Sequence, residues 1–134
     1  MLVDDSIVRG NTVREIIKIA QEMGARKVYC AIHSAPLKAP CFYGIDMSTK
    51  GEFIATKFNL DVDKICSDIG ADHLFYMSIN DMIKAAKQSN PSIDNFCTAC
   101  FSGEYPTNDI DEKVLSEFQI DRENATRAYN KSQS

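Results

Sequence analysis

The sequence predicts an α/β protein built on a parallel sheet, because strand-like and helix-like segments alternate along its first half. Leu2-Val3 has the apolar character of a buried strand end, and residues 12–23 carry apolar side chains at helical spacing. Residues 27–33 form a second strand-like run, rich in β-branched and aromatic residues. A strand, a helix and a strand in this order make a βαβ unit, which implies parallel strands.

The rest of the chain continues the alternation and then loses it. Gly24 is placed to end the first helix, and Gly70 to end a later one. Beyond Asp94 regular patterning fades, so we divide the chain into a sheet domain over residues 1–94 and an irregular, partly helical extension over residues 95–134. The remaining predicted elements are helices over residues 49–56, 61–69, 80–88 and 110–118, a strand over 74–77 and a polar, frayed end over 121–134.

Charge and composition narrow the class of protein. A net charge of −4 argues against nucleic acid as the main partner, because phosphate backbones bind basic faces. No apolar run approaches the ~18 residues of a membrane span. Five cysteines without a positively charged leader indicate a reducing compartment, the cytoplasm. The chain enters a strand at its second residue, so we expect an N-terminally truncated sheet whose other strands precede Met1.

A candidate phosphate loop joins the first strand to the first helix. Ligands of α/β sheets bind at the carboxyl ends of strands, and the free N–H groups that open the following helix favour an anion. Gly10 lets the backbone approach the anion closely, while Ser6, Thr12 and Arg9 add hydroxyl donors and positive charge. The loop matches neither G-x-x-x-x-G-K-[ST] nor G-x-G-x-x-G. Its residues are Asp4, Asp5, Ser6, Ile7, Val8, Arg9, Gly10, Asn11 and Thr12.

The adjacent acids suit a different part of a ligand. Carboxylates can accept hydrogen bonds from ribose hydroxyls, and Asp4 and Asp5 can hold Mg²⁺ directly or through its water. Neighbouring strand residues point to opposite faces, so only one acid faces the ligand unless the strand breaks here. Taken alone, the pair is also typical of a solvated strand end followed by an ordinary turn.

The cysteines fall into two groups. Cys30 and Cys66 lie on apolar faces and are predicted to pack in the core. Cys97 and Cys100 form C-x-x-C, and Cys41 follows Pro40 in a loop. These three can be ordinary thiols, part of a zinc site that recruits His33, a redox pair, or three of the four thiolates of a [4Fe–4S] cluster.

The ten residues VDDSIVRGNT resemble the signature of the type I phosphoribosyltransferases, and in this form the amidophosphoribosyltransferases in particular. The resemblance runs without a break over residues 1–107. The further strings that carry it are Gly24-Ala25-Arg26-Lys27-Val28-Tyr29, Pro40-Cys41-Phe42-Tyr43-Gly44-Ile45-Asp46-Met47, Glu52-Phe53-Ile54-Ala55, Ile69-Gly70-Ala71-Asp72 and Phe101-Ser102-Gly103-Glu104-Tyr105-Pro106-Thr107.

The resemblance implies the type I phosphoribosyltransferase fold and the first committed step of purine synthesis, in which phosphoribosyl pyrophosphate, glutamine and water give phosphoribosylamine, glutamate and pyrophosphate. Asp4 and Asp5 would be the ribose and Mg²⁺ acids, and residues 6–12 the 5′-phosphate loop. Cys41, Cys97 and Cys100 would hold a [4Fe–4S] cluster whose fourth cysteine precedes residue 1. Glutamine or ammonia would arrive through an N-terminal domain that this chain lacks.

The same resemblance implies purine nucleotide inhibitors and a homo-oligomer at full length. We identify no catalytic residue in these 134 residues and expect the chain alone to be inactive. Three alternatives stay open: a nucleobase-salvage phosphoribosyltransferase, a nucleotide-sensing relative without activity, and a metal-binding interaction module built on Cys97 and Cys100. A salvage enzyme should not share the string around Cys41 or the C-terminal C-x-x-C. Nucleotide-sensing relatives often lose the acids or the loop glycine, whereas Asp4, Asp5 and Gly10 are all present here. A metal-binding module would leave the loop of residues 4–12 unexplained.

Overall fold

The core of the protein is a parallel sheet of three strands in the order β1-β2-β3. This computed structural model describes residues 1–47, 49–107 and 109–132. Leu2, Cys30 and Leu74 lie side by side across the sheet, as do Asp4, Ile32 and Tyr76 two residues further on. The predicted α/β class and the parallel pairing are therefore confirmed. The strands are β1 (Leu2–Asp4), β2 (Tyr29–Ile32) and β3 (His73–Tyr76).

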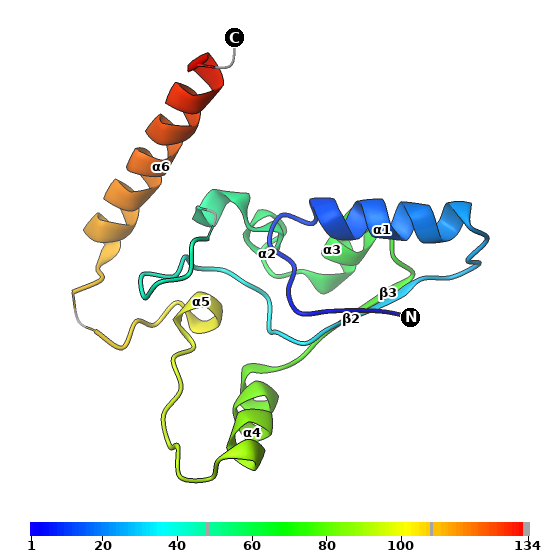
Figure 1. Cartoon of the computed structure of the whole chain (residues 1–134), viewed down its shortest axis with the longest axis horizontal. Coiled ribbons are helices and arrows are strands. Elements are labelled where there is room, and N and C mark those ends of the chain that lie inside the picture. The colour runs from blue at the N-terminus through cyan, green and yellow to red at the C-terminus, as the bar shows by residue number, and fades with distance from the viewer. Residues whose placement is uncertain (48, 108, 133–134) are drawn as a thin grey trace.

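Helices cover one face of the sheet and form the hydrophobic core with it (Figure 1). These helices are α1 (Asn11–Glu22), α2 (Ile54–Lys57) and α3 (Val62–Ile69). Ile17 and Ile65 are among the most deeply buried side chains, and Cys30 and Cys66 belong to the same core, as predicted. The opposite face carries Val3 and Phe75, which are 52% and 57% exposed, so the described residues do not cover it as parallel sheets are usually covered on both faces.

Three segments differ from the sequence-based expectations. The helix expected over residues 49–56 is divided into a 3₁₀ turn, η1 (Lys50–Glu52), and α2, because the fully buried Phe53 between them has an extended backbone. The short helix α5 (Ala99–Ser102) was not predicted. The expectation of a frayed end over residues 121–134 is wrong up to residue 132, since helix α6 (Glu112–Ser132) spans it; residues 133–134 lie outside the described part. No glycine or proline follows Pro106, so nothing in the sequence breaks this helix.

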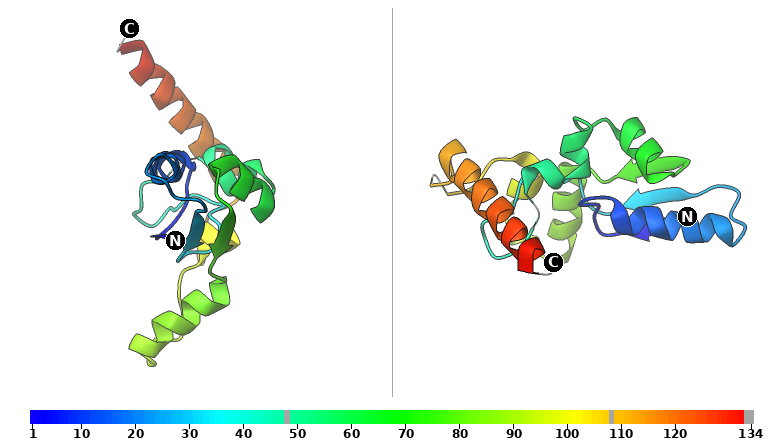
Figure 2. Two further views of the ribbon diagram at one scale, coloured as in Figure 1. Left: turned by 90° about the vertical axis from the view of Figure 1, so that its right-hand side faces the viewer. Right: turned by 90° about the horizontal axis from the view of Figure 1, so that it is seen from above.

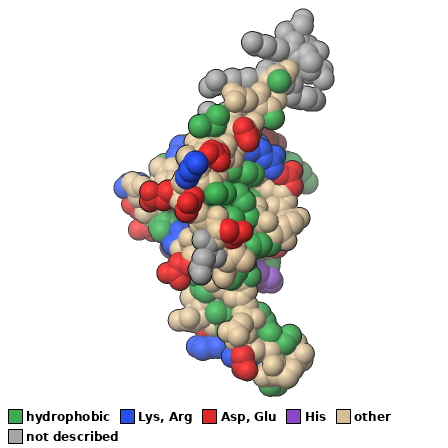
Figure 3. All heavy atoms as spheres, turned by 90° about the vertical axis from the view of Figure 1, so that its left-hand side faces the viewer, with side chains coloured by type: hydrophobic (Ala, Val, Ile, Leu, Met, Phe, Trp, Pro, Cys, Tyr) green, Lys and Arg blue, Asp and Glu red, His purple; other side chains and the backbone are tan. Residues whose placement is uncertain are grey.

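The helices that follow the sheet lie away from it. Helix α4 (Ile79–Ser89) has no buried residue and extends on the side opposite α1, while α6 projects past the other end of the molecule (Figures 1 and 2). The base of α6 is anchored by Phe118, whose ring centroid lies 5.0 Å from that of Phe42. The face of the molecule at this end shows a band of apolar side chains beside acidic and basic ones (Figure 3). Among the described helices, none combines the length and the apolar character that a membrane span needs.

Candidate functional site

The predicted phosphate loop lines a cavity of about 1160 Å³ at the carboxyl end of β1. The whole stretch from Asp4 to Val13 contributes to its wall, together with residues from three other places in the sequence. A strand end, a tight loop and a helix N-terminus thus meet at one cavity, as ligand sites of α/β sheets require. The residues outside the loop that line it are Leu37, Ile45, Asp46, Met47, Thr49, Gly51, Glu52, Gln119 and Arg122.

Gly10 closes the loop at the start of α1. Its φ of +79° lies in the left-handed region, and a Cβ atom there would approach Ile54 Cδ1 to 2.7 Å. The backbone N–H of Ile54 also donates to the Val8 carbonyl at 2.8 Å, so a hydrogen bond connects α2 to the loop. A larger residue here would strain the backbone and displace Ile54, which is a reason for glycine separate from the close approach to an anion that the sequence suggested.

Both acids of the pair reach the cavity, because β1 ends at Asp4. The backbone N–H of Asp5 donates to Asp4 Oδ1 at 2.9 Å, and the Ser6 hydroxyl donates to Asp5 Oδ1 at 3.2 Å. The strand therefore breaks at the acid pair, which is the condition under which both acids can lie on the same cavity. Within the described part of the chain, no lysine, arginine or histidine forms a salt bridge with either carboxylate, so their charges stay available to a cation or to ribose hydroxyls.

The cavity contains two ion pairs that the sequence patterns did not predict. Arg9 Nη2 lies 2.6 Å from Glu52 Oε1, and Glu52 Oε2 accepts hydrogen bonds from the backbone N–H and the hydroxyl of Thr49. Arg122 of α6 pairs with Asp46. Glu52 and Asp46 occur in strings that carry the family resemblance, but their partners in space are far away in sequence. The two arginines on the cavity wall are thus already partnered by carboxylates.

Cys41, Cys97 and Cys100 lie outside the hydrophobic core, close enough for the Cys41 and Cys97 thiols to influence that of Cys100. The carbonyl of Cys100 accepts from the backbone N–H groups of Lys38 and Ala39 at 2.9 and 3.1 Å, which holds α5 beside the loop that leads to Cys41. Tyr105 closes the group by donating its hydroxyl to the Pro40 carbonyl at 2.8 Å. The C-terminal extension is therefore attached to the segment around Pro40.

The thiols of this group influence one another. Burial acts to raise the pKa of Cys41, but hydrogen bonds from the backbone N–H groups of Ile45 and Tyr43 and the side chain of Cys100 together lower it. Burial, the Cys41 thiol and the Cys97 thiol raise the pKa of Cys100 to about 11. No set of three or more His, Cys, Asp and Glu side chains in the described residues is arranged to hold a metal ion, so the thiols are neighbours without forming a preformed metal site.

Sequence comparison identifies related proteins. The amidophosphoribosyltransferase of Escherichia coli K12 is 45% identical over 115 residues, which are 86% of this chain and 22% of that protein. The amidophosphoribosyltransferase of Bacillus subtilis strain 168 is 43% identical over 116 residues, 86% of this chain and 24% of the relative. No protein-family model matches the chain. The chain thus spans only about a quarter of these relatives' length.

Structural comparison agrees. The glutamine phosphoribosylpyrophosphate amidotransferase of B. subtilis, solved in complex with ADP and GMP, superposes with a TM-score of 0.71 at 43% identity, over 84% of this chain and 25% of that one. A second structure, described as the allosteric regulatory enzyme of purine biosynthesis, also gives a TM-score of 0.71, at 42% identity. The parallel sheet and its covering helices therefore have the type I phosphoribosyltransferase fold, and the chain belongs to the amidophosphoribosyltransferase family as the homologue of a segment of its members.

Proposed function

We propose that this chain forms the ribose 5-phosphate half of the phosphoribosyl pyrophosphate site of an amidophosphoribosyltransferase, the enzyme of the first committed step of purine synthesis. The observation that carries the proposal is the loop from Asp4 to Thr12, which lines the large cavity between β1 and α1. The 43–45% identity to amidophosphoribosyltransferases supports this proposal.

The 5′-phosphate would bind where α1 begins. The first N–H groups of a helix have no partner within the helix, and its dipole favours an anion there. Gly10 keeps the loop backbone close, Ser6 and Thr12 offer hydroxyl donors, and Ile7 and Val8 contribute through the backbone. Arg9 would act through its charge while paired with Glu52, which reduces the net charge that it brings to the phosphate.

Asp4 and Asp5 would hold the ribose hydroxyls and Mg²⁺. Carboxylate oxygens are the ligands that Mg²⁺ prefers, and these two line the cavity without a salt bridge to any described residue. The ion would neutralise the negative charge of the pyrophosphate group. Because the carboxylates are adjacent at a strand end, they fix the ribose ring relative to the phosphate loop and so orient the anomeric carbon.

The chain would contribute positioning and charge stabilisation to the reaction. Ammonia displaces pyrophosphate at the anomeric carbon through an oxocarbenium-like transition state, and a bound, oriented ribose lowers the entropic part of that barrier. We assign no catalytic residue in this chain. Glutamine hydrolysis, which supplies the ammonia, would be the task of a part of the protein outside these 134 residues.

We further propose that Cys41, Cys97 and Cys100 are three ligands of a [4Fe–4S] cluster, with the fourth supplied from outside the chain. The backbone hydrogen bonds from residues 38 and 39 to the Cys100 carbonyl support this assignment, because they hold α5 beside the segment that leads to Cys41. The absence of a preformed trio of ligands among the described residues means that these side chains would have to rearrange around the cluster. The cluster would be structural or oxygen-sensing.

Other features follow from the same proposal. The sheet domain of residues 1–94 would bind the substrate and supply Cys41, and the extension of residues 95–134 would supply the other two cluster ligands, Cys97 and Cys100. Purine nucleotides would inhibit, since a nucleoside monophosphate presents the same ribose 5-phosphate group; the B. subtilis relative was solved with ADP and GMP. We expect a cytoplasmic protein that is a homo-oligomer at full length.

Calorimetric titration of the 134-residue chain tests the proposal. Phosphoribosyl pyrophosphate and ribose 5-phosphate should bind in the presence of Mg²⁺, and Gly10→Val should abolish the binding of both, because its side chain would displace Ile54 and the loop. Binding of a free nucleobase together with phosphoribosyl pyrophosphate would favour a salvage enzyme. A chain that binds neither phosphate ester would contradict the assignment of the cavity.

A further inference from the structure

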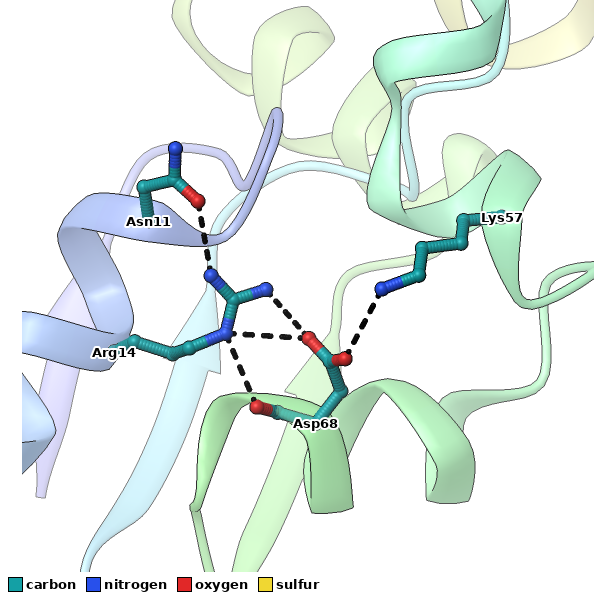
Figure 4. Close-up of polar contacts among 4 residues, drawn as sticks. All are labelled: Asn11, Arg14, Lys57 and Asp68. Atoms are coloured by element: carbon teal, nitrogen blue, oxygen red, sulfur yellow. Dashed lines mark hydrogen bonds and ion pairs between the residues drawn. The ribbon is translucent and has the colours of Figure 1, made fainter.

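Arg14 connects the phosphate loop to a helix that is distant in sequence. Its Nε and Nη2 atoms donate to the Asp68 carboxylate at 3.2 and 2.5 Å, and Nε also lies 3.1 Å from the Asp68 carbonyl (Figure 4). Its remaining nitrogen, Nη1, donates to Asn11 Oδ1 at 2.9 Å. One guanidinium group thus joins α3 to a residue on the wall of the cavity.

The helix dipoles do not explain why Arg14 and Asp68 occupy these positions. Arg14 lies in the first turn of α1, where the helix dipole disfavours a cation, and Asp68 lies in the last turn of α3, where it disfavours an anion. Each charge is compensated by the other across the two helices. Nε and Nη2 both donate to the same oxygen, Asp68 Oδ2, and Nε also faces the Asp68 carbonyl, so three contacts orient the planar guanidinium as well as binding it.

The orientation of Arg14 decides which end of the Asn11 amide is free. Every arginine N–H is a donor, so only the carbonyl oxygen of Asn11 can face it. The amide nitrogen then points away from Arg14, as Figure 4 shows. Asn11 is exposed and lines the cavity beside Gly10. A phosphate oxygen that reaches Asn11 on the side away from Arg14 would therefore meet a donor and not an acceptor.

We propose that the Asp68–Arg14 pair positions Asn11 so that its side-chain amide donates a hydrogen bond to the phosphate group bound in this cavity. The inference rests on the proposed function, because it assumes a phosphate ligand at the loop. In this proposal Asn11 touches the ligand, whereas Arg14 and Asp68 act through Asn11. The carboxylate of Asp68 is also 3.3 Å from Lys57 Nζ, and Figure 4 shows no contact between Lys57 and Asn11.

The test measures the dissociation constants of ribose 5-phosphate and of inorganic phosphate for variants of the 134-residue chain. Asn11→Asp keeps the shape and the acceptor for Arg14 but replaces the donor by an anionic oxygen, so both ligands should bind more than about tenfold more weakly. Asn11→Ala should weaken both roughly fivefold. Arg14→Lys keeps the charge but loses the fork, and should weaken both about threefold. Lys57→Gln removes a charge near Asp68 without touching the fork, and should stay within about twofold of the wild type.

A double-mutant cycle separates positioning from a structural role. If Arg14 acts through Asn11, Arg14→Lys should have no further effect on either dissociation constant in the Asn11→Ala background. Thermal unfolding and amide NMR spectra identify variants that lose the fold, and Arg14→Gln replaces Arg14→Lys if the latter does so. An equal effect of Arg14→Lys in both backgrounds, or wild-type affinity of Asn11→Asp, overturns the proposal while the assignment of the cavity stands. A wild-type chain that binds neither ligand overturns both.

Discussion

Ile54 limits the size of the residue at position 10, because a Cβ atom on Gly10 would lie 2.7 Å from Ile54 Cδ1. Ile54 belongs to α2, so its side chain packs the phosphate loop against this helix. The backbone N–H of Ile54 also donates a hydrogen bond to the Val8 carbonyl, which is a second link between the loop and α2. Two separate costs therefore follow from a side chain at Gly10: the left-handed backbone and the collision.

The two costs can be separated by mutation. Gly10→Ala should destabilise the chain by about 2 kcal/mol or more, of which the left-handed backbone accounts for roughly 1–2 kcal/mol. Ile54→Val deletes the Cδ1 atom that causes the collision and should itself cost about 1 kcal/mol. Gly10→Ala should therefore cost less in the Ile54→Val background, as measured by urea unfolding. An identical cost in both backgrounds would show that the collision is relieved by movement elsewhere.

The paired acids should control the Mg²⁺ dependence of binding. Asp4→Asn and Asp5→Asn should each weaken Mg²⁺-dependent binding of phosphoribosyl pyrophosphate by roughly tenfold, because an amide is a much poorer ligand for a hard cation. Asp94→Asn is the matched control, since its carboxylate lies near Lys87 on another part of the chain. Calorimetry with and without Mg²⁺ measures the effect. Unchanged Mg²⁺ dependence with both acids replaced would remove them from the site.

The cysteine assignment predicts a difference between two kinds of serine variant. After anaerobic incubation with iron, sulfide and an excess of a small thiol as fourth ligand, the wild-type chain should take up iron, and Cys41→Ser, Cys97→Ser and Cys100→Ser should each take up less. Cys30→Ser should retain iron binding but lower stability by about 1–3 kcal/mol, because it places a hydroxyl in the core. Iron and acid-labile sulfide per chain are the measurements. Equal iron uptake by all four variants would exclude these ligands.

Local signals in the sequence predicted the sheet and the loop. Strand and helix periodicity placed β1, α1, β2, α3, β3 and α4 within a few residues of their observed bounds, and Gly70 ends α3 in a left-handed conformation, as expected of a C-cap glycine. These features depend on neighbours in the chain, which patterns record. The division of residues 49–57 at Phe53 could not be predicted in this way, because burial of one ring in the tertiary structure overrides a helical pattern.

The ion pairs around the loop could not be predicted from the sequence. Glu52 binds Arg9, Asp46 binds Arg122 and Asp68 binds Arg14, and each partnership spans between 43 and 76 positions. A single sequence carries no signal for such pairs. The position of Arg122 on the cavity wall was also missed because residues 121–134 were expected to fray, whereas α6 carries Arg122 to the site.

The Asp68–Arg14 pair predicts how stability depends on pH. Hydrogen bonds from Arg14 oppose the effect of burial and, with Lys57, lower the pKa of Asp68 below its ordinary value of 3.8. Its contribution, about 1 kcal/mol for a partly exposed pair, should be complete well above pH 3.8 and should be lost as the pH falls through the lowered pKa. The difference in unfolding free energy between the wild type and Asp68→Asn should therefore shrink below about pH 4. A difference that is constant from neutral pH to pH 3 would show that the carboxylate charge does not carry the contact.

The last prediction is that the 134-residue chain binds phosphoribosyl pyrophosphate without turning it over. Stabilising a departing pyrophosphate requires preorganised positive charge, and among the described residues of the cavity wall the two arginines are already paired, Arg9 with Glu52 and Arg122 with Asp46. Mg²⁺ at Asp4 and Asp5 would supply charge near the ribose, but the described residues of the cavity wall offer no further donors for the leaving group.

Ammonia-dependent release of pyrophosphate, followed with a coupled phosphate assay, should stay at background although calorimetry detects binding. The positive control adds the remaining segment of a related amidophosphoribosyltransferase as a separate chain. Turnover should then appear, because that segment would bring the missing donors. Turnover by the chain alone would mean that the donors lie within these 134 residues, and Arg9→Gln and Arg122→Gln would then be the first variants to test.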